Sequence, residues 1–426
     1  MLSRVQLEPI PRPEQDIRAF ETIRAHAVGS FCVSRSRRSA EGTLLSPSRL
    51  FPVDGVEVFA KARAPAHAFS ESDRLLARPL EAREKPTLAL AVAAWRAWQS
   101  PDFTAWDGQV GPDDPVVRAA LAREQSATSL RRLLRDPLGF VWRSALGWRP
   151  ADIHSDVLAL DHATFGELVH EVLGLAVERL ESTPGLNRAT LQELQGAVEV
   201  AGDTVALRWP SERPVPPALL WRRTIDEAVR LAVAGLAFDQ GLQPGTRSWS
   251  EVPFGEEAEA AAWQIDAEVR LGGLRVGGRI DRLDLRGDGG AARVTDYKTS
   301  AVPRNMSAIV LAGGAELQRV TYAAAVRCLL PEVRQVVSRL TYLRGGPEAH
   351  ALSGDALDAA IADTERFIAA AVALVSDGAA PPGPDAREPF NNLRLALPAD
   401  LENYLFRKSR ALWTAAGELP TFWSAP

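Results

Sequence analysis

Two strands joined by a short turn are predicted in residues 274–300, LRVGGRIDRLDLRGDGGAARVTDYKTS. The RGDGGA segment (286–291) has the glycine and aspartate content of a hairpin loop. Residues two apart in a strand share a face, so we expect Asp296 and Lys298 to lie together and Tyr297 to face the other way.

The same alternation places Ile280 on one face of the first strand and Asp281 with Leu283 on the other. An unpaired carboxylate among apolar neighbours is costly to desolvate, so a positive group should face Asp281. Asp284 falls on the opposite face from Asp281, and we expect it to pair with an arginine.

Two carboxylates and a lysine on one hairpin suit phosphodiester hydrolysis, in which a hard cation neutralises charge and activates a water. Mg²⁺ prefers oxygen ligands, so Asp281, Asp296 and a backbone carbonyl would suffice, and the Tyr297 carbonyl is a candidate. The compact ammonium of Lys298 can hold the attacking water and stabilise developing negative charge.

Helices are predicted on both sides of this hairpin. HATFGELVHEVLGLAVERLEST carries an apolar stripe, with Thr164 and Glu167 at the spacing of a capping box, and places His170 on the helix. A second helix is predicted from about Glu316 to Leu329. Gln318 and Tyr322 lie four apart and share one face of it.

These segments resemble known motifs. GRIDRLD (278–284) followed by VTDYKTS (294–300) is similar to the two core motifs of the PD-(D/E)XK nucleases, in their RecB-like branch. GELVHEVL (166–173) resembles the upstream histidine motif of that branch, and ELQRVTYAAAV (316–326) resembles its Gln-x-x-x-Tyr motif. The four motifs occur in the expected order, and SATSLRRLLRDPLGFVWRSALGW also resembles the opening segment of AddB-like domains.

The resemblance implies a restriction-endonuclease-like α/β core, with a mixed central sheet flanked by helices and an extra N-terminal region. It implies a nuclease that requires Mg²⁺ or Mn²⁺. The implied metal ligands are His170, Asp281, Asp296 and the Tyr297 carbonyl, with Lys298 on the attacking water. Gln318 and Tyr322 would position the DNA backbone or the lysine.

Some features depart from the family or stay outside the predicted site. AddB-like nucleases often hold an iron-sulfur cluster whose first cysteine lies in a Cys-Pro, where this chain has Asp136-Pro137. We therefore expect no cluster and expect packing to hold the broken helix near Pro137. Glu251, in SEVPFG, resembles a recurrent glutamate of these domains but is not included among the predicted ligands.

The composition limits the partners. A net charge of −5 argues against a protein that coats nucleic acid, because that needs a dense basic surface. Arginines cluster in RSRR (35–38), SLRRLLR (129–135) and WRR (221–223), each equally compatible with a solvated face or a local nucleic-acid contact. Only four of the 49 basic residues are lysines, and the two cysteines are expected to be reduced.

The sequence also predicts how the chain divides into regions. Residues 1–115 are predicted to form an accessory region and 116–426 the nuclease domain, with further strands in 249–285, a strand in VVSRLTYLR, a helix at 354–376 and a flexible GAAPPGPDA (378–386).

No apolar run or leader indicates a membrane protein, so a cytoplasmic location is expected. The sequence contains no Walker-type phosphate-binding loop (G-x-x-x-x-G-K-[ST]), so we expect it to have no helicase motor of its own. Because RecB-like nuclease domains commonly work beside a helicase, the resemblance implies a helicase partner acting in trans, in DNA repair or in defence against foreign DNA. The alternatives are a catalytically silent subunit that binds DNA or assembles a complex, and RNA as the substrate.

Overall fold

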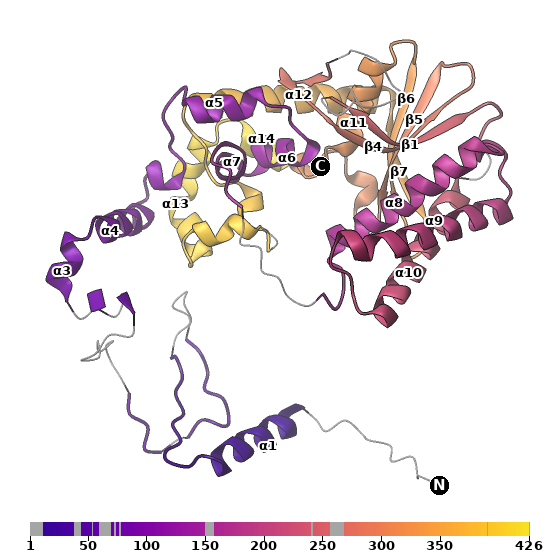
Figure 1. The fold of residues 1–426 in the computed structure, drawn as a ribbon. Coiled ribbons are helices and arrows are strands. Elements are labelled where there is room, and N and C mark those ends of the chain that lie inside the picture. Colours follow the sequence, from indigo (N-terminus) through magenta and orange to yellow (C-terminus); the bar gives the residue numbers. More distant parts are fainter. Residues whose placement is uncertain are drawn as a thin grey trace, which may run out of the picture. The chain divides into compact units, whose positions relative to one another are not determined.

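The structure, a computed structural model, describes residues 12–37, 44–52, 54–58, 70–71, 74–75, 78–149, 157–239, 242–255, 268–389 and 391–425. The chain divides into two compact units. The first comprises 1–100 with 397–407, and the second comprises 101–396 with 408–426. Figure 1 shows the elements in chain order.

Within its first hundred residues, the first unit contains the described helices α1 (Arg12–Ala25), α3 (Pro79–Glu84) and α4 (Pro86–Gln99). Residues 401–407, the start of α13, also belong to this unit. Both α3 and α4 begin at a proline, whose fixed φ and missing N–H suit the first turn of a helix.

A five-stranded mixed sheet forms the centre of the second unit, in the order β1-β4-β5-β6-β7. In this sheet β5 pairs with β6 in parallel, and the other three pairs are antiparallel. This confirms the predicted α/β class with a mixed sheet. The strands are β1 (Arg247–Phe254), β4 (Gly278–Leu285), β5 (Ala291–Lys298), β6 (Gln335–Tyr342) and β7 (Glu348–Ser353), with β2 (Arg270–Leu271) and β3 (Leu274–Arg275) in a separate ribbon.

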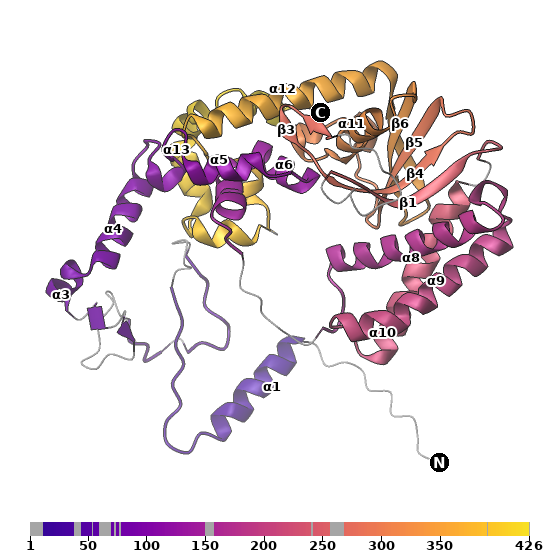
Figure 2. The same ribbon diagram turned by 45° about the horizontal axis from the view of Figure 1, so that its top comes forward.

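Helices cover both faces of the sheet (Figure 2). One layer buries Tyr297 and Leu343 against α8 (His162–Ser182), α9 (Leu191–Glu212) and α10 (Ala218–Phe238). The other layer shares a large apolar cluster with the sheet. It contains α11 (Gln318–Leu329) and α12 (Gly354–Ser376), together with α5 (Pro115–Ala122), α6 (Ala127–Arg135), the four-residue α7 (Pro137–Phe140) and α14 (Leu419–Trp423), while α13 spans Leu401–Ala415.

The long helix α8 positions the predicted histidine. Its N-cap is Asp161, whose carboxylate accepts from the Thr164 N–H at 2.9 Å. The expected capping box at Thr164 and Glu167 is therefore wrong, because the helix begins earlier, at His162. The apolar stripe of the helix is buried as predicted.

The simple alternation expected of β4 fails at Asp281. Ile280 and Leu283, three residues apart, both join the apolar cluster that includes α11. Arg282 between them enters a buried polar network with Asp239 and the Tyr297 hydroxyl. Across β1, the residue opposite Asp281 in register has a positive φ, and such a backbone conformation interrupts regular strand geometry at this point.

The stretch GAAPPGPDA is ordered and largely buried, so its expected flexibility is wrong. Asp385 forms ion pairs with Arg131 (2.7 Å) and Arg135 (2.6 Å) of α6. Gly383 lies against the Arg135 carbonyl, where a Cβ would approach to 2.1 Å. These contacts hold the segment in place although its sequence is rich in proline and glycine.

The turn between α6 and α7 is held by hydrogen bonds as well as by packing, which corrects the expectation of packing alone. Asp136 is buried and lies at the N-terminus of α7. Its carboxylate accepts from the Asn391 side-chain amide at 3.3 Å and packs against Gly139. A carboxylate thus connects this turn to the C-terminal segment.

Parts of the expected strand WQIDAEVRL lie outside the described residues. Strand β7 was not predicted from the sequence; its side chains are mostly small or polar. Within the described residues, the helices are all too short or too polar to cross a bilayer.

Candidate metal centre

The candidate site lies where β4 and β5 separate. Their ladder ends at the pair Arg282 and Thr295. Beyond it, the Asp281 carboxylate bridges the gap by accepting from the Tyr297 N–H at 2.8 Å. The Asp281 side chain therefore takes the place that the backbone of β4 would hold in a continuous β4–β5 ladder. Its other oxygen, Oδ1, faces the opening between the two strands, on the side of His170.

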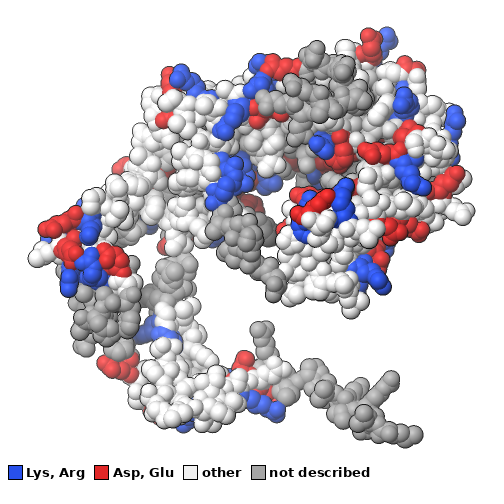
Figure 3. Space-filling model, viewed as in Figure 1, with Lys and Arg blue, Asp and Glu red and all other residues white. Residues whose placement is uncertain are grey.

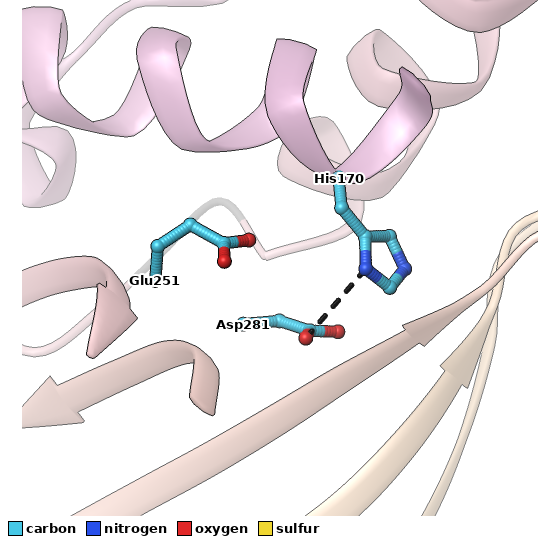
Figure 4. Close-up of side chains that lie close together, drawn as sticks. All are labelled: His170, Glu251 and Asp281. Atoms are coloured by element: carbon cyan, nitrogen blue, oxygen red, sulfur yellow. Dashed lines mark ion pairs between the residues drawn. The ribbon is translucent and has the colours of Figure 1, made fainter. Parts of the chain in front are cut away.

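His170 reaches this opening from α8. Its Nε2 lies 2.8 Å from the Tyr297 carbonyl oxygen, and its Nδ1 lies 3.6 Å from Asp281 Oδ1. The helix thus brings an imidazole to both strands at the point of separation (Figure 4).

Glu251 completes a cluster with His170 and Asp281. One ligand atom of each lies within 4.8 Å of the others, and Figure 4 shows the three side chains facing one another. Glu251 stands opposite Asp281 in the β1–β4 register and has a φ of 49°, which is uncommon for a non-glycine residue. The predicted ligand set omitted it. The signal in the sequence was the resemblance of SEVPFG to a segment that carries a recurrent glutamate in these domains.

Asp296 and Lys298 lie on one face of β5, as predicted. Lys298 Nζ is 2.5 Å from Asp296 Oδ2 and donates to Gln318 Oε1 at 2.6 Å. Gln318 is the first residue of α11, and Tyr322, one turn later, contacts its side chain. The ammonium is therefore held between the sheet and α11.

The charges of this cluster are strongly coupled. Burial raises the pKa of Asp281 to about 7, and the Asp296 carboxylate adds to that rise. Burial acts to lower the pKa of His170, but Asp281 and Asp296 outweigh it and the net shift is upward. Burial likewise opposes protonation of Lys298, yet Asp296 raises its pKa overall, so the lysine stays charged.

The donor set fits a divalent cation. Asp296 is 1% exposed, and neither carboxylate oxygen has a hydrogen-bond partner among the described residues, although Oδ2 forms the ion pair with Lys298. Burying carboxylates this close together is unfavourable unless more positive charge is present. Imidazole, carboxylate and carbonyl groups meet here, and hard divalent ions accept carboxylate and carbonyl oxygens.

The predicted site residues do gather around one opening. His170 lies against both the Tyr297 carbonyl and the Asp281 carboxylate, and the charge of Asp296, which pairs with Lys298, acts on His170 and Asp281. The charges of Asp296 and Asp281 also act on Tyr322. Burial first, and then these two carboxylates, raise the pKa of Tyr322 well above its ordinary value.

Asp284 belongs to a different environment, and the expectation that it pairs with arginine is confirmed. Its carboxylate contacts Arg282 at 2.7 Å and Arg293 at 2.8 Å, and it accepts from the Ser248 hydroxyl. Burial would raise its pKa, but the two guanidinium groups outweigh it, and the pKa is lowered. This carboxylate needs no further cation.

A family model agrees with the fold. The model of the PD-(D/E)XK nuclease superfamily matches residues 124–388. One solved structure, from Eubacterium rectale and described as "Putative exonuclease", is 11% identical with a TM-score of 0.35, over 64% of this chain and 88% of that chain. A similarity this low assigns neither activity nor substrate. No curated protein shows a significant match. Because the family match extends over more than half of the chain and includes every element of the candidate site, the chain belongs to the PD-(D/E)XK nuclease superfamily.

Proposed function

We propose that the chain hydrolyses phosphodiester bonds of DNA with Mg²⁺ or Mn²⁺. The observation that carries the proposal is the cluster of His170, Asp281 and Glu251 at the point where the two strands separate, with Asp296 and a protonated lysine paired on the adjoining strand. Superfamily membership supports the same reaction class.

The proposed ligands are the carboxylates of Asp281 and Asp296, the His170 imidazole and the Tyr297 carbonyl, with Glu251 as a further candidate. A bound divalent ion would supply charge neutralisation at the phosphate and acidify a coordinated water. His170 already contacts the Tyr297 carbonyl and faces Asp281, so the helix and strands hold three of these groups in place.

Lys298 would act as a positive group and not as a general base. Its raised pKa keeps it protonated at neutral pH, so it can donate to the attacking water or to a phosphate oxygen as negative charge develops. Gln318 accepts one of its hydrogens and fixes the direction of the ammonium. Gln318 and Tyr322 therefore support the lysine from α11.

The test is cleavage of 5′- and 3′-labelled linear DNA, and of circular DNA, with Mg²⁺, Mn²⁺ or EDTA. Metal-dependent cleavage by the wild type, lost in Asp296→Asn, supports the proposal. Asp288→Asn is a matched control, because Asp288 is an exposed carboxylate on the turn of the same hairpin and pairs with Arg286. Wild-type protein that binds DNA but leaves it intact with either metal would favour the silent-subunit alternative.

The resemblance to RecB-like domains suggests that a helicase acts beside this chain, in repair or in defence against foreign DNA. Copurification from native cells tests that part separately. Parallel reactions with RNA of the same sequence distinguish the two substrate classes.

A further inference from the structure

A second polar site lies beside the candidate metal centre. A pocket of about 520 Å³ is lined by four arginines and by the glycines that lead into β4: Arg123, Arg132, Arg143, Arg149, Gly277 and Gly278. Figure 3 shows basic side chains gathered near the centre of this face, at the position of α7 in Figure 1.

The arginines of this pocket are poorly neutralised. Burial, and then the neighbouring Arg143, lower the pKa of Arg132, and burial with Arg149 lowers that of Arg143. Within the described residues, the side chain of Arg132 forms no hydrogen bond or ion pair, and Asp136 is the carboxylate whose charge acts on it. The pocket therefore holds positive charge in excess of its own counterions.

The remaining arginines donate mainly to backbone carbonyls. Arg123 donates to the Ser144 carbonyl, and Arg149 donates to the carbonyls of Arg143 (2.8 Å) and Trp148 (3.0 Å). A guanidinium group has five donors, so such contacts hold each side chain in place and leave donors for a ligand. Among the described residues of the lining, Glu124 is the one acidic residue, and its carboxylate lies against the backbone of Gly277.

The pocket is fixed relative to the metal centre. Gln125, which is 3% exposed, forms a parallel bridge with Val276, donates to the Arg275 carbonyl and accepts from the Gly277 N–H. Gly278 then begins β4, three residues before Asp281. At roughly 3.4 Å per residue, that separation is about 10 Å, which corresponds to a few nucleotide steps along one strand of a duplex.

We propose that this pocket binds a phosphate group of the nucleic-acid strand whose cleavage occurs at the Asp281 site. The proposal rests on the proposed function for its choice of ligand, and the phosphate is either internal to the strand or terminal. Guanidinium forks match phosphate oxygens, and sites with several arginines are suited to this recognition. A phosphate held here would set which bond reaches the metal centre.

Binding of fluorescein-labelled 20-nucleotide single strands in EDTA tests the pocket without any cleavage. We expect Arg132→Ala combined with Arg143→Ala to weaken binding about tenfold or more. The salt dependence should fall by about 0.7 in log–log slope for each lost phosphate contact. Arg366→Ala is the matched control, since it removes one exposed arginine of α12 that pairs with Asp363.

Three probes separate the sources of the phosphate. A loss confined to the 5′-phosphorylated strand, absent for the 5′-hydroxyl strand and for a circle, assigns a terminal phosphate. A loss on all three assigns an internal one. Unchanged affinity and salt slope on all three overturns the proposal. A chain that never cuts DNA, but whose binding depends on these arginines, would contradict the proposed function and leave the pocket supported.

Folding of the variants is checked by thermal unfolding. If Arg132→Ala does not fold, Arg143→Ala with Arg149→Ala replaces it, because both side chains donate to backbone carbonyls. The same expectations apply to that pair.

Discussion

Asp281 and Asp284 lie three residues apart on one strand, and their environments differ in every electrostatic respect. Asp284 meets two guanidinium groups, and its pKa is lowered. Asp281 meets an imidazole, a backbone N–H and a second carboxylate, and its pKa rises to about 7. The Asp284 side chain is buried, and that of Asp281 is 10% exposed. The fold thus neutralises one carboxylate itself and leaves the other requiring a cation.

The largest expected effect is on cleavage. Asp281→Asn or Asp296→Asn should reduce the rate roughly a thousandfold or more, because each removes a charged oxygen ligand worth several kcal/mol in the transition state. The measurement is single-turnover cleavage with saturating Mn²⁺. Asp288→Asn should cut at the wild-type rate, and a fast Asp281→Asn variant would remove this residue from the site.

Lys298→Ala should slow cleavage by about a hundredfold to a thousandfold, the loss typical of one donor to a developing negative charge. Lys298→Arg keeps the charge but introduces a planar fork where Gln318 and Asp296 hold a compact ammonium, so it should rescue only a small part. Full activity of the arginine variant would show that charge alone matters there.

The free energy of unfolding should fall more when Asp284 is replaced than when Asp281 is replaced. Asp284→Ala leaves Arg282 buried beside a single remaining carboxylate, Asp239, and should cost about 3–5 kcal/mol. Asp281→Ala removes a carboxylate whose charge is unfavourable without a cation, so the unfolding free energy should not fall comparably. Urea unfolding in EDTA measures both, and equal losses would contradict the contrast drawn above.

Asp136 should give an effect on stability that depends on pH. Burial raises its pKa from the ordinary value of 3.8 to about 7. Between these values the folded chain holds a proton that the unfolded chain has released, so stability falls as pH rises from about 4 to 7 and then levels. The slope reaches at most about 1.4 kcal/mol per pH unit. Asp136→Asn stays neutral and should flatten this profile in thermal unfolding; an unchanged profile would contradict the assignment.

Much of the fold was predictable because its signals are local. The hairpin at β4 and β5, the stripe of α8 and the start of α11 follow from periodicity and motif spacing. The burial of residues 378–386 was not predictable, because it depends on ion pairs between Asp385 and arginines some 250 positions earlier.

The candidate site was predictable in its residues but not in its geometry. Alternation brought Asp296 and Lys298 together, and a motif pointed to His170. The position of Glu251 depends on the β1–β4 register and on its own positive φ, and neither follows from composition or periodicity. The arginine pocket combines a helix, a π-helical turn and a strand start, so the sequence could indicate only that SLRRLLR is basic.

Manganese located by its anomalous scattering, in crystals of the wild type and of Asp281→Asn, tests the central claim most directly. We predict one peak in contact with the Asp281 and Asp296 carboxylates and the His170 ring, absent from the variant. A peak elsewhere, or no peak in the wild type with these three side chains ordered and apart, would contradict the metal centre.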